Sequence, residues 1–184
     1  MTTILTPCHD GKLDILYVNS LLETLRHVAD VIPVWLPGES IVQKARNELF
    51  KIAYESPADS ILWIDADQMW TPDNVKAILD DEHDFVTGLV RQKCDGGAWC
   101  IRNPDEKSQT IESCGMGFCK MTRKVIDELW RKSKPYGSGF RNVFECSIDG
   151  GGYVSEDISA CRKWKGKIYY RPDIIVGHIG QKIY

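Results

Sequence analysis

The chain has 184 residues and a formal net charge of −3, with 43% hydrophobic and 27% charged side chains. This composition is ordinary for a soluble globular protein, and the length suits one domain with its own core. No stretch approaches the roughly 20 apolar residues of a membrane-spanning helix, and the N-terminus lacks the pattern of a signal peptide, so we expect a cytoplasmic protein.

The first ninety residues alternate between strand patterns and helix patterns. Short β-prone or nearly all-apolar runs predict strands at residues 3–6, 31–36, 60–64 and 85–90. Apolar residues at helical spacing predict helices at residues 13–28, from Ser40 onward with a capping box completed by Gln43, and from Thr71-Pro72 onward. The alternation predicts an α/β protein with a mainly parallel sheet.

The second half of the chain is less regular. Residues 95–108 are expected to form a loop or irregular hairpin, and residues 133–153 a long, mobile loop of the kind that often covers a site. Around them we expect a strand at 114–121, a helix from 122 to 130, a helix capped by Ser155, and strands at 168–170 and 174–176.

The seven cysteines form no Cys-x-x-Cys pair, and their number is odd. Together with the absence of a signal-peptide pattern, this predicts reduced thiols rather than a disulfide framework. A zinc site remains an alternative, although the spacings fit zinc knuckles poorly; its ligands would be Cys94, Cys100, Cys114 and Cys119.

Two aspartates, Asp65 and Asp67, directly follow the apolar run at residues 60–64. The carboxyl ends of strands are where open α/β sheets bind ligands. A turn there can bring both carboxylates onto one divalent cation, whose other positions would take substrate phosphates. The sequence therefore predicts a Mn²⁺ or Mg²⁺ site; the alternative is an ordinary strand-to-helix loop with solvated acids.

Three further groups have side chains suited to the same site. The guanidinium of Arg46 can contact a phosphate or base, or it could pair with a neighbouring surface glutamate. Glu156 and Asp157 could take a proton from a hydroxyl, or they could be acids favoured at a helix N-terminus. His178, flanked by glycines, could be a ligand of Mn²⁺ or an ordinary structural histidine.

The order of these motifs resembles that of GT-A glycosyltransferases (family 2-like), particularly the short members found in bacteria and their phages. The resemblance extends to further segments: Thr6-Pro7-Cys8-His9, Val86-Thr87-Gly88-Leu89-Val90-Arg91, Ser155-Glu156-Asp157 and Gly115-Met116-Gly117-Phe118. It implies a single GT-A domain over residues 1–184, Rossmann-like and of the nucleotide-diphospho-sugar transferase type, with a mixed, mainly parallel central sheet. Residues 1–92 would form the nucleotide-binding half, and residues 93–184 the acceptor and catalytic half.

The resemblance also implies a role for each matching residue. The nucleotide-sugar would contact Thr6, Pro7, His9, Arg46, Asp65, Arg91, Gly115 and Gly117. The cation would be held by Asp65, Asp67 and His178. In an inverting member Asp157 would be the catalytic base, with Glu156 beside it.

We therefore predict a metal-dependent, hexosyltransferase-like glycosyltransferase that moves a sugar from a nucleotide-sugar, expected to be a UDP-sugar, to an acceptor hydroxyl. The acceptor could be DNA, a glycan or a protein; basic side chains concentrate in the second half, which keeps an anionic acceptor open. A phage-encoded enzyme would work in the host cytoplasm. The alternatives are a metal-dependent phosphoryl-transfer enzyme or nuclease, and a non-catalytic nucleotide- or carbohydrate-binding protein.

Overall fold

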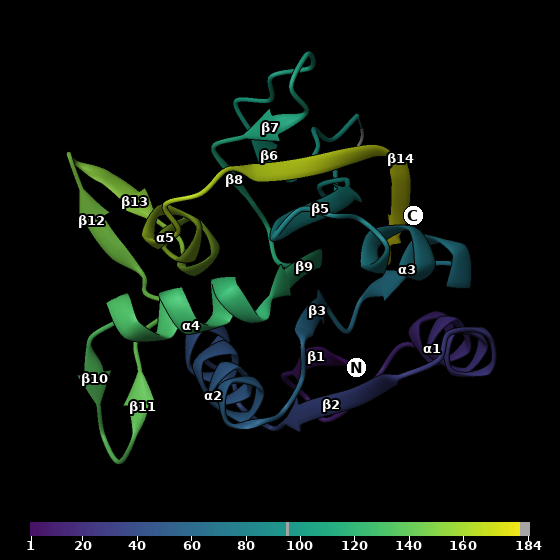
Figure 1. Ribbon diagram of the computed structural model, residues 1–184, viewed down its shortest axis with the longest axis horizontal. Coiled ribbons are helices and arrows are strands. Elements are labelled where there is room, and N and C mark those ends of the chain that lie inside the picture. Colours follow the sequence, from purple (N-terminus) through teal and green to yellow (C-terminus); the bar gives the residue numbers. More distant parts are fainter. Residues whose placement is uncertain (95, 181–184) are drawn as a thin grey trace.

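A mixed eight-stranded sheet runs through the computed structural model, which describes residues 1–94 and 96–180 (Figure 1). Its strands are β1 (Thr2–Cys8), β2 (Val31–Pro37), β3 (Ser60–Ile64), β4 (Gln68–Met69), β5 (Phe85–Val90), β7 (Thr110–Ile111), β9 (Phe118–Thr122) and β14 (Ile168–His178). Their order is β2-β1-β3-β9-β5-β14-β4, with β7 paired on β14.

Most of the long strands point the same way. β2, β1 and β3 pair in parallel, and β5 pairs in parallel with β14. β9 runs antiparallel between β3 and β5, so these two strands share one direction. The α/β class with a mixed central sheet is therefore confirmed, and the carboxyl ends of the five strands that share one direction meet at one edge.

Helices cover both faces of the sheet: α1 (Ile15–His27), α2 (Val42–Glu55), α3 (Pro72–Leu79), α4 (Arg123–Lys132) and α5 (Glu156–Lys163). α2 and α4 pack on β1, β3 and β9 from one side, with α5 against α4, whereas α1 and α3 pack together on the other (Figure 1, left and right). Among the described residues, no helix combines the length and apolar character needed to cross a membrane.

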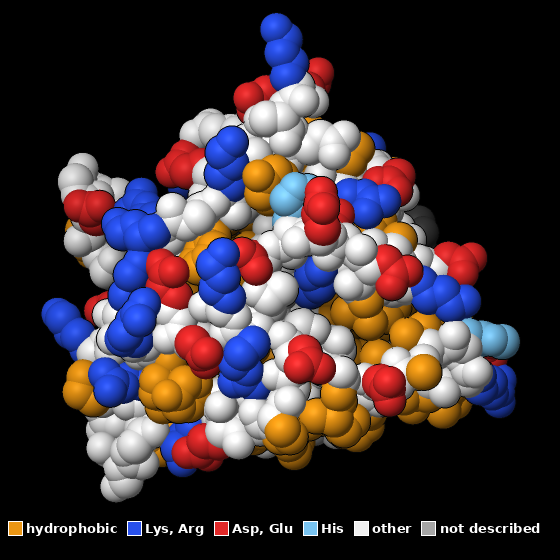
Figure 2. Space-filling view, viewed as in Figure 1, with side chains coloured by type: hydrophobic (Ala, Val, Ile, Leu, Met, Phe, Trp, Pro, Cys, Tyr) orange, Lys and Arg blue, Asp and Glu red, His pale blue; other side chains and the backbone are white. Residues whose placement is uncertain are grey.

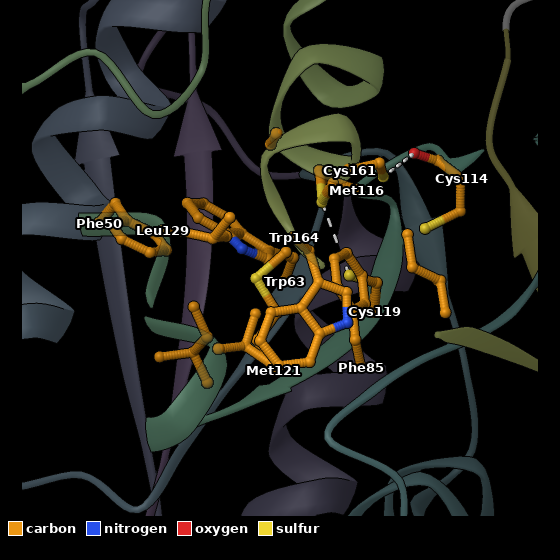
Figure 3. Close-up of a cluster of buried hydrophobic side chains, with 14 of the residues drawn as sticks. Phe50, Trp63, Phe85, Cys114, Met116, Cys119, Met121, Leu129, Cys161 and Trp164 are labelled. Carbon is orange, nitrogen blue, oxygen red and sulfur yellow. Dashed lines mark hydrogen bonds between the residues drawn. The ribbon is translucent and has the colours of Figure 1, made fainter. Parts of the chain in front are cut away.

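The two faces have separate cores because side chains alternate along each strand. In β3, Ile61 and Trp63 belong to the cluster under α2 and α4, while Leu62 and Ile64 belong to the cluster under α1 and α3. All four side chains are fully buried. Figure 3 shows Trp63 in the first cluster, with Phe50 from α2 and Leu129 from α4.

Among the residues that the structure describes, the four cysteines of the alternative zinc site are not arranged to hold a metal ion. Cys114 and Cys119 are buried among apolar side chains of the first cluster, whereas Cys94 is exposed (Figure 3). Contact with the Cys119 thiol, together with burial, raises the pKa of Cys114 well above its usual value. A buried, protonated thiol is a poor zinc ligand.

The start of α2 differs from the prediction. Ile41 is the N-cap residue and no side chain caps the helix, so the expected capping box of Ser40 and Gln43 does not form. Instead, the carboxylate of Glu39 accepts a hydrogen bond from the Ile41 N–H at 3.1 Å. The expected cap at Thr71 does form, as a capping box with Asn74.

Pairings between short segments explain the differences in the second half: β6 (Ile101–Arg102), β8 (Ser113–Cys114), β10 (Pro135–Tyr136), β11 (Phe140–Arg141), β12 (Ser147–Asp149) and β13 (Gly152–Val154). The strand expected at 114–121 is split into β8 and β9. The loop expected at 133–153 contains the hairpins β10–β11 and β12–β13, and β6 pairs with β8. Residue 95, where the other expected loop begins, lies outside the described residues.

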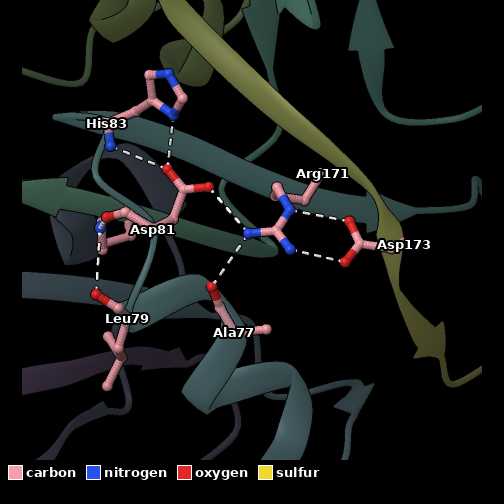
Figure 4. A network of polar contacts seen from close by, with 7 residues as sticks. Ala77, Leu79, Asp81, His83, Arg171 and Asp173 are labelled. Atoms are coloured by element: carbon pink, nitrogen blue, oxygen red, sulfur yellow. Dashed lines mark hydrogen bonds and ion pairs between the residues drawn. The ribbon is translucent and has the colours of Figure 1, made fainter.

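A polar clamp explains why residues 168–170 and 174–176 belong to one strand, β14, rather than to two (Figure 4). The strand shifts register against β5 between these segments. There Arg171 donates to Asp81 at 3.0 Å and pairs with Asp173 at 2.7 Å. Asp81 also accepts from the backbone N–H of His83 at 2.9 Å. The clamp thus fixes the bend of β14 to the segment that follows α3.

Asp81 and Asp173 both bind Arg171, but their side chains are 7% and 59% exposed. We expect Asp81→Ala to lower the free energy of unfolding by about 2 kcal/mol, because the partly buried donors of His83 and Arg171 lose a buried acceptor. The matched substitution Asp173→Ala should cost less than about 1 kcal/mol, as exposed pairs do. Urea denaturation at pH 7 measures both. Equal losses would contradict this account.

The Asp81 effect should also depend on pH. Burial raises the pKa of Asp81, but hydrogen bonds from His83 and Arg171 outweigh burial and hold the pKa below 3.8. A carboxylate with a lowered folded-state pKa stabilises the fold above its unfolded pKa and loses that contribution as pH falls through the folded value. The difference between wild type and Asp81→Ala should therefore shrink below about pH 4.

Candidate active site at the carboxyl edge of the sheet

The predicted residues come from segments that end at the same edge of the sheet. Asp65 follows β3, Arg91 follows β5, and His178 ends β14. Parallel strands bring their carboxyl ends together, so residues far apart in sequence meet here. The first turn of α5 contributes Glu156 and Asp157.

Arg46 is the buried charge at the centre of this edge. Its side chain is 5% exposed; Nη2 donates to Oδ1 of Asp65 at 2.9 Å, and Nε lies 3.5 Å from Oε1 of Glu156. The guanidinium also lies over the ring of Trp63, 5.4 Å from its centroid. The alternative surface pairing does not occur: Glu39 pairs with a lysine instead.

The charge of Arg46 is fixed by its surroundings. Burial lowers its pKa, but Asp65 and Glu156 outweigh burial and raise the pKa above its usual value. Within the described structure, Nε and Nη1 are buried without a hydrogen-bond partner. A buried donor without a partner is costly, so two N–H groups at this site remain available to an acceptor group of a ligand.

A cavity of about 390 Å³, here named the inner cavity, opens beside this pair. It is lined by seven of the predicted site residues: Arg46, Asp65, Gly115, Gly117, Glu156, Asp157 and His178. Sequence reasoning missed other lining residues, among them Gln68, Trp99, Cys100, Arg102 and Ser113. These belong to β4 and to the pairings around β6 and β8, which carry no recognisable motif.

Asp157 is held in place at the wall of the inner cavity. Oδ1 accepts from the backbone N–H of Ile158 at 2.7 Å and from the hydroxyl of Ser155. A Cβ on Gly115 would lie 3.7 Å from Oδ2 of Asp157 and 3.5 Å from Cβ of Cys100. A side chain at position 115 would thus occupy space next to the carboxylate.

A second cavity of about 760 Å³, the outer cavity, lies on the other side of Arg46 and Asp65. Both residues line both cavities. The outer cavity also contains two of the residues expected to bind nucleotide, Pro7 and His9. Its walls carry more acidic than basic side chains, including Asp10, Asp14, Glu39 and Asp67. An anionic ligand there would need positive charge to accompany it.

Only part of the expected metal-binding set comes together. Pairing of β4 with β14 places His178 opposite Gln68, and Nε2 of His178 lies 3.5 Å from Oδ2 of Asp67. Asp65 instead faces Arg46. Within residues 1–94 and 96–180, no three His, Cys, Asp or Glu side chains are arranged to hold a metal ion.

The chemistry around Asp67 nevertheless fits a cation. The ammonium group of Lys93 pairs with Oδ2 of Asp67, the same oxygen that faces His178. Nδ1 of His178 lies 2.6 Å from the carbonyl oxygen of Arg91, which orients the ring and turns Nε2 toward the carboxylate. The ammonium group of Lys93 therefore lies where a divalent ion bound to Asp67 would lie.

Two residues expected to contact the nucleotide-sugar, Thr6 and Arg91, line neither the inner nor the outer cavity. Thr6 is fully buried, and its hydroxyl lies 2.6 Å from the Tyr17 hydroxyl, so it lines neither cavity. The side chain of Arg91 stacks on Trp99 with 4.1 Å to the ring centroid and donates to the carbonyl of Gly97 at 3.1 Å. The polar groups of both side chains are thus in contact with protein groups in this structure.

Comparisons with solved structures show that this fold also occurs in other proteins. The chain superimposes on the crystal structure of A197 from STIV with a TM-score of 0.67 and 17% identity, over 98% of this chain and 87% of that one. It also superimposes on the inositol-1-phosphate CTP transferase from T. maritima with a TM-score of 0.54 and 12% identity, over 97% and 88%. No protein-family model and no curated protein sequence matches the chain.

The buried Arg46 makes a testable contribution to stability. Arg46→Met should lower the free energy of unfolding by about 3 kcal/mol, because Asp65 and Glu156 lose their buried partner. Adding Asp65→Asn should recover part of this loss, with a coupling energy of about 1–3 kcal/mol. Urea denaturation of the two single variants and the double variant measures the coupling.

Lys44 provides the control, since it lies on the same helix and is half exposed in pairs with glutamates. Lys44→Met should cost less than about 1 kcal/mol. Strictly additive effects of the Arg46 and Asp65 substitutions would show that the two side chains are not coupled.

Proposed function

We propose that the protein is a metal-dependent glycosyltransferase that moves a sugar from a nucleotide-sugar, with a UDP-sugar as the first donor to test, to an acceptor hydroxyl. The observation that carries the proposal is the junction of the two cavities at Arg46 and Asp65. One side holds the carboxylate of Asp157, and the other leads to Asp67 and His9. A donor spanning the junction has its reacting bond next to a base.

The outer cavity is assigned to the nucleoside diphosphate. Its acidic walls make a divalent cation a physical requirement for binding this anion tightly. Asp67 and His178 would hold the cation, with Asp65 as the additional carboxylate. Bound Mn²⁺ or Mg²⁺ would supply charge neutralisation for the departing diphosphate. Arg46 contributes buried N–H donors at the same end.

The inner cavity is assigned to the transferred sugar and the attacking hydroxyl. Oδ2 of Asp157 faces the space left by Gly115. As the acceptor oxygen bonds to the anomeric carbon, the bond from that carbon to the diphosphate oxygen breaks, and the hydroxyl proton passes to Asp157. Glu156 lies 3.5 Å from Arg46, so its role is to keep that guanidinium in place.

Nucleotidyl transfer is the second candidate, favoured by the fold shared with a CTP transferase. The two reactions break different bonds. A glycosyltransferase releases a nucleoside diphosphate from a nucleotide-sugar, whereas a nucleotidyltransferase releases pyrophosphate from a nucleoside triphosphate. Incubation with both donor classes and analysis of the released phosphate compound therefore separates them. Pyrophosphate release without diphosphate release would replace the first proposal by the second.

Substitutions at the two cavities should have different effects. Asp67→Asn should remove the Mn²⁺-dependent part of UDP binding in calorimetry, because one cation ligand loses its charge. Asp157→Asn should leave UDP binding unchanged and lower diphosphate release from the accepted donor by about 100-fold or more, since a general base typically contributes that much. Glu128→Gln, at a partly buried ion pair on α4 that lines neither cavity, is the control. Unchanged turnover in Asp157→Asn would overturn its assignment as the base.

Lys93 should compete with the metal ion for Asp67. We expect Lys93→Ala to bind Mn²⁺ about two- to fivefold more tightly, because an exposed ion pair of less than about 1 kcal/mol no longer has to break. Electron paramagnetic resonance of free Mn²⁺ measures this without any turnover assay. Lys76→Ala, which removes an exposed lysine on α3, should leave Mn²⁺ binding unchanged. Weaker binding in Lys93→Ala would mean that Lys93 supports the site instead.

A further inference from the structure

A third cavity of about 350 Å³, here named the Tyr170 cavity, adjoins the inner cavity. The two cavities share Trp99 and Ile101 as lining residues. The other residues that line the Tyr170 cavity are Leu89, Pro104, Glu106, Gln109, Tyr170 and Pro172. A ligand extending past Trp99 from the inner cavity would therefore enter a second recess of a size typical for small-ligand sites.

The walls of the Tyr170 cavity combine flat apolar rings with two hydrogen-bonding side chains. Trp99, Tyr170 and the two prolines offer the ring faces, and Glu106 and Gln109 offer the polar atoms. Among the described lining residues there is no Lys, Arg or His. This chemistry suits a neutral polyhydroxylated ring, whose C–H face packs on rings while its hydroxyls bond to amide and carboxylate oxygens. A phosphodiester chain would instead need cations.

The walls are held in position by contacts outside the cavity. The stacking of Arg91 on Trp99 fixes the indole ring, and the N–H of Cys100 donates to the carbonyl of Val90 at 2.8 Å. Gln109 has a φ of +51°, a left-handed conformation that costs about 1 kcal/mol for a residue with a Cβ. The N–H of Tyr170 donates to the Gln109 carbonyl at 2.9 Å and stabilises this conformation. The amide side chain thus starts from a fixed backbone position.

Many basic side chains of the second half lie on α4 and α5, which contribute no residue to the Tyr170 cavity. Figure 2 shows Lys and Arg side chains over the left of the view, where α4 and α5 lie, interspersed with acidic side chains. Four of these basic residues, Lys124, Lys132, Arg162 and Lys163, each pair with an acidic side chain. Pairing reduces the field that such a surface offers a polyanion, so the charge distribution favours an uncharged acceptor over DNA.

We propose that the Tyr170 cavity binds a saccharide unit of a neutral glycan acceptor, whose reacting hydroxyl lies one or more units away beside Asp157. The assignment rests on the proposed function and names its acceptor class. It gives Arg91 a positioning role, through Trp99, in place of the expected contact with the donor. Trp99 then lies between the inner cavity, where the sugar would be transferred, and the cavity that would hold the rest of the acceptor.

Binding of an array of neutral oligosaccharides to the full chain tests the proposal, with calorimetry on the best ligand. We expect Gln109→Gly to weaken that ligand at least fivefold while keeping the fold, because glycine adopts the left-handed φ without strain. Lys107→Ala, two residues away and outside the cavity lining, should bind as wild type. Binding of no oligosaccharide, or equal affinity in Gln109→Gly, would overturn the proposal, as would preferential, salt-dependent binding of duplex DNA.

The experiment is independent of the transferase assignment because it contains no donor. If the full chain binds no UDP with or without Mn²⁺, the proposed function is wrong, even when a saccharide binds in the Tyr170 cavity. Intact Mn²⁺-dependent UDP binding with no saccharide binding would sink only the acceptor assignment. Arg91→Lys distinguishes a positioning role of Arg91 from a direct contact with the donor. It should weaken oligosaccharide binding, since a lysine cannot stack on Trp99 in the same way, but leave UDP affinity unchanged.

Discussion

The edge of the sheet is organised around one buried positive charge. Arg46 comes from α2, its partners come from the end of β3 and the start of α5, and its guanidinium lies over Trp63 from the core. Burial of a charge is tolerated only with partners of opposite sign. The need to satisfy Arg46 therefore ties three elements of the fold together where the inner and outer cavities meet.

The acidic side chains at this edge therefore make different contacts. Asp65 neutralises Arg46, so it is less available to a metal ion than the spacing of Asp65 and Asp67 suggests. Asp67 and His178 face each other because β4 pairs with the last strand. Asp157 is left facing an open space next to Gly115. In the proposed function, charge neutralisation of Arg46, cation binding and proton transfer would therefore depend mainly on different residues.

Side-chain hydrogen bonds between distant segments hold other parts of the backbone in place. Asn47, next to Arg46 on α2, accepts from the N–H of Phe144 and donates to its carbonyl, both at 2.9 Å. This two-way contact holds the segment between the hairpins β10–β11 and β12–β13, which the sequence alone suggests is a mobile loop. The clamp of Asp81 and Arg171 does the same for the bend of β14. Each contact joins residues about ninety or more positions apart.

The sequence by itself determined the elements whose signals are local. The apolar run at residues 60–64, the cap at Thr71 and the alternation of strands and helices predicted the first half of the sheet and the edge that carries the site. Only the tertiary structure decided the insertion of β9, the pairing of β4 with β14 and the partner of Arg46, because these depend on contacts between distant segments. For the same reason the side chains of Thr6 and Arg91 could not be assigned from motifs: packing against Tyr17 and Trp99 uses the groups that the motifs offer to a ligand.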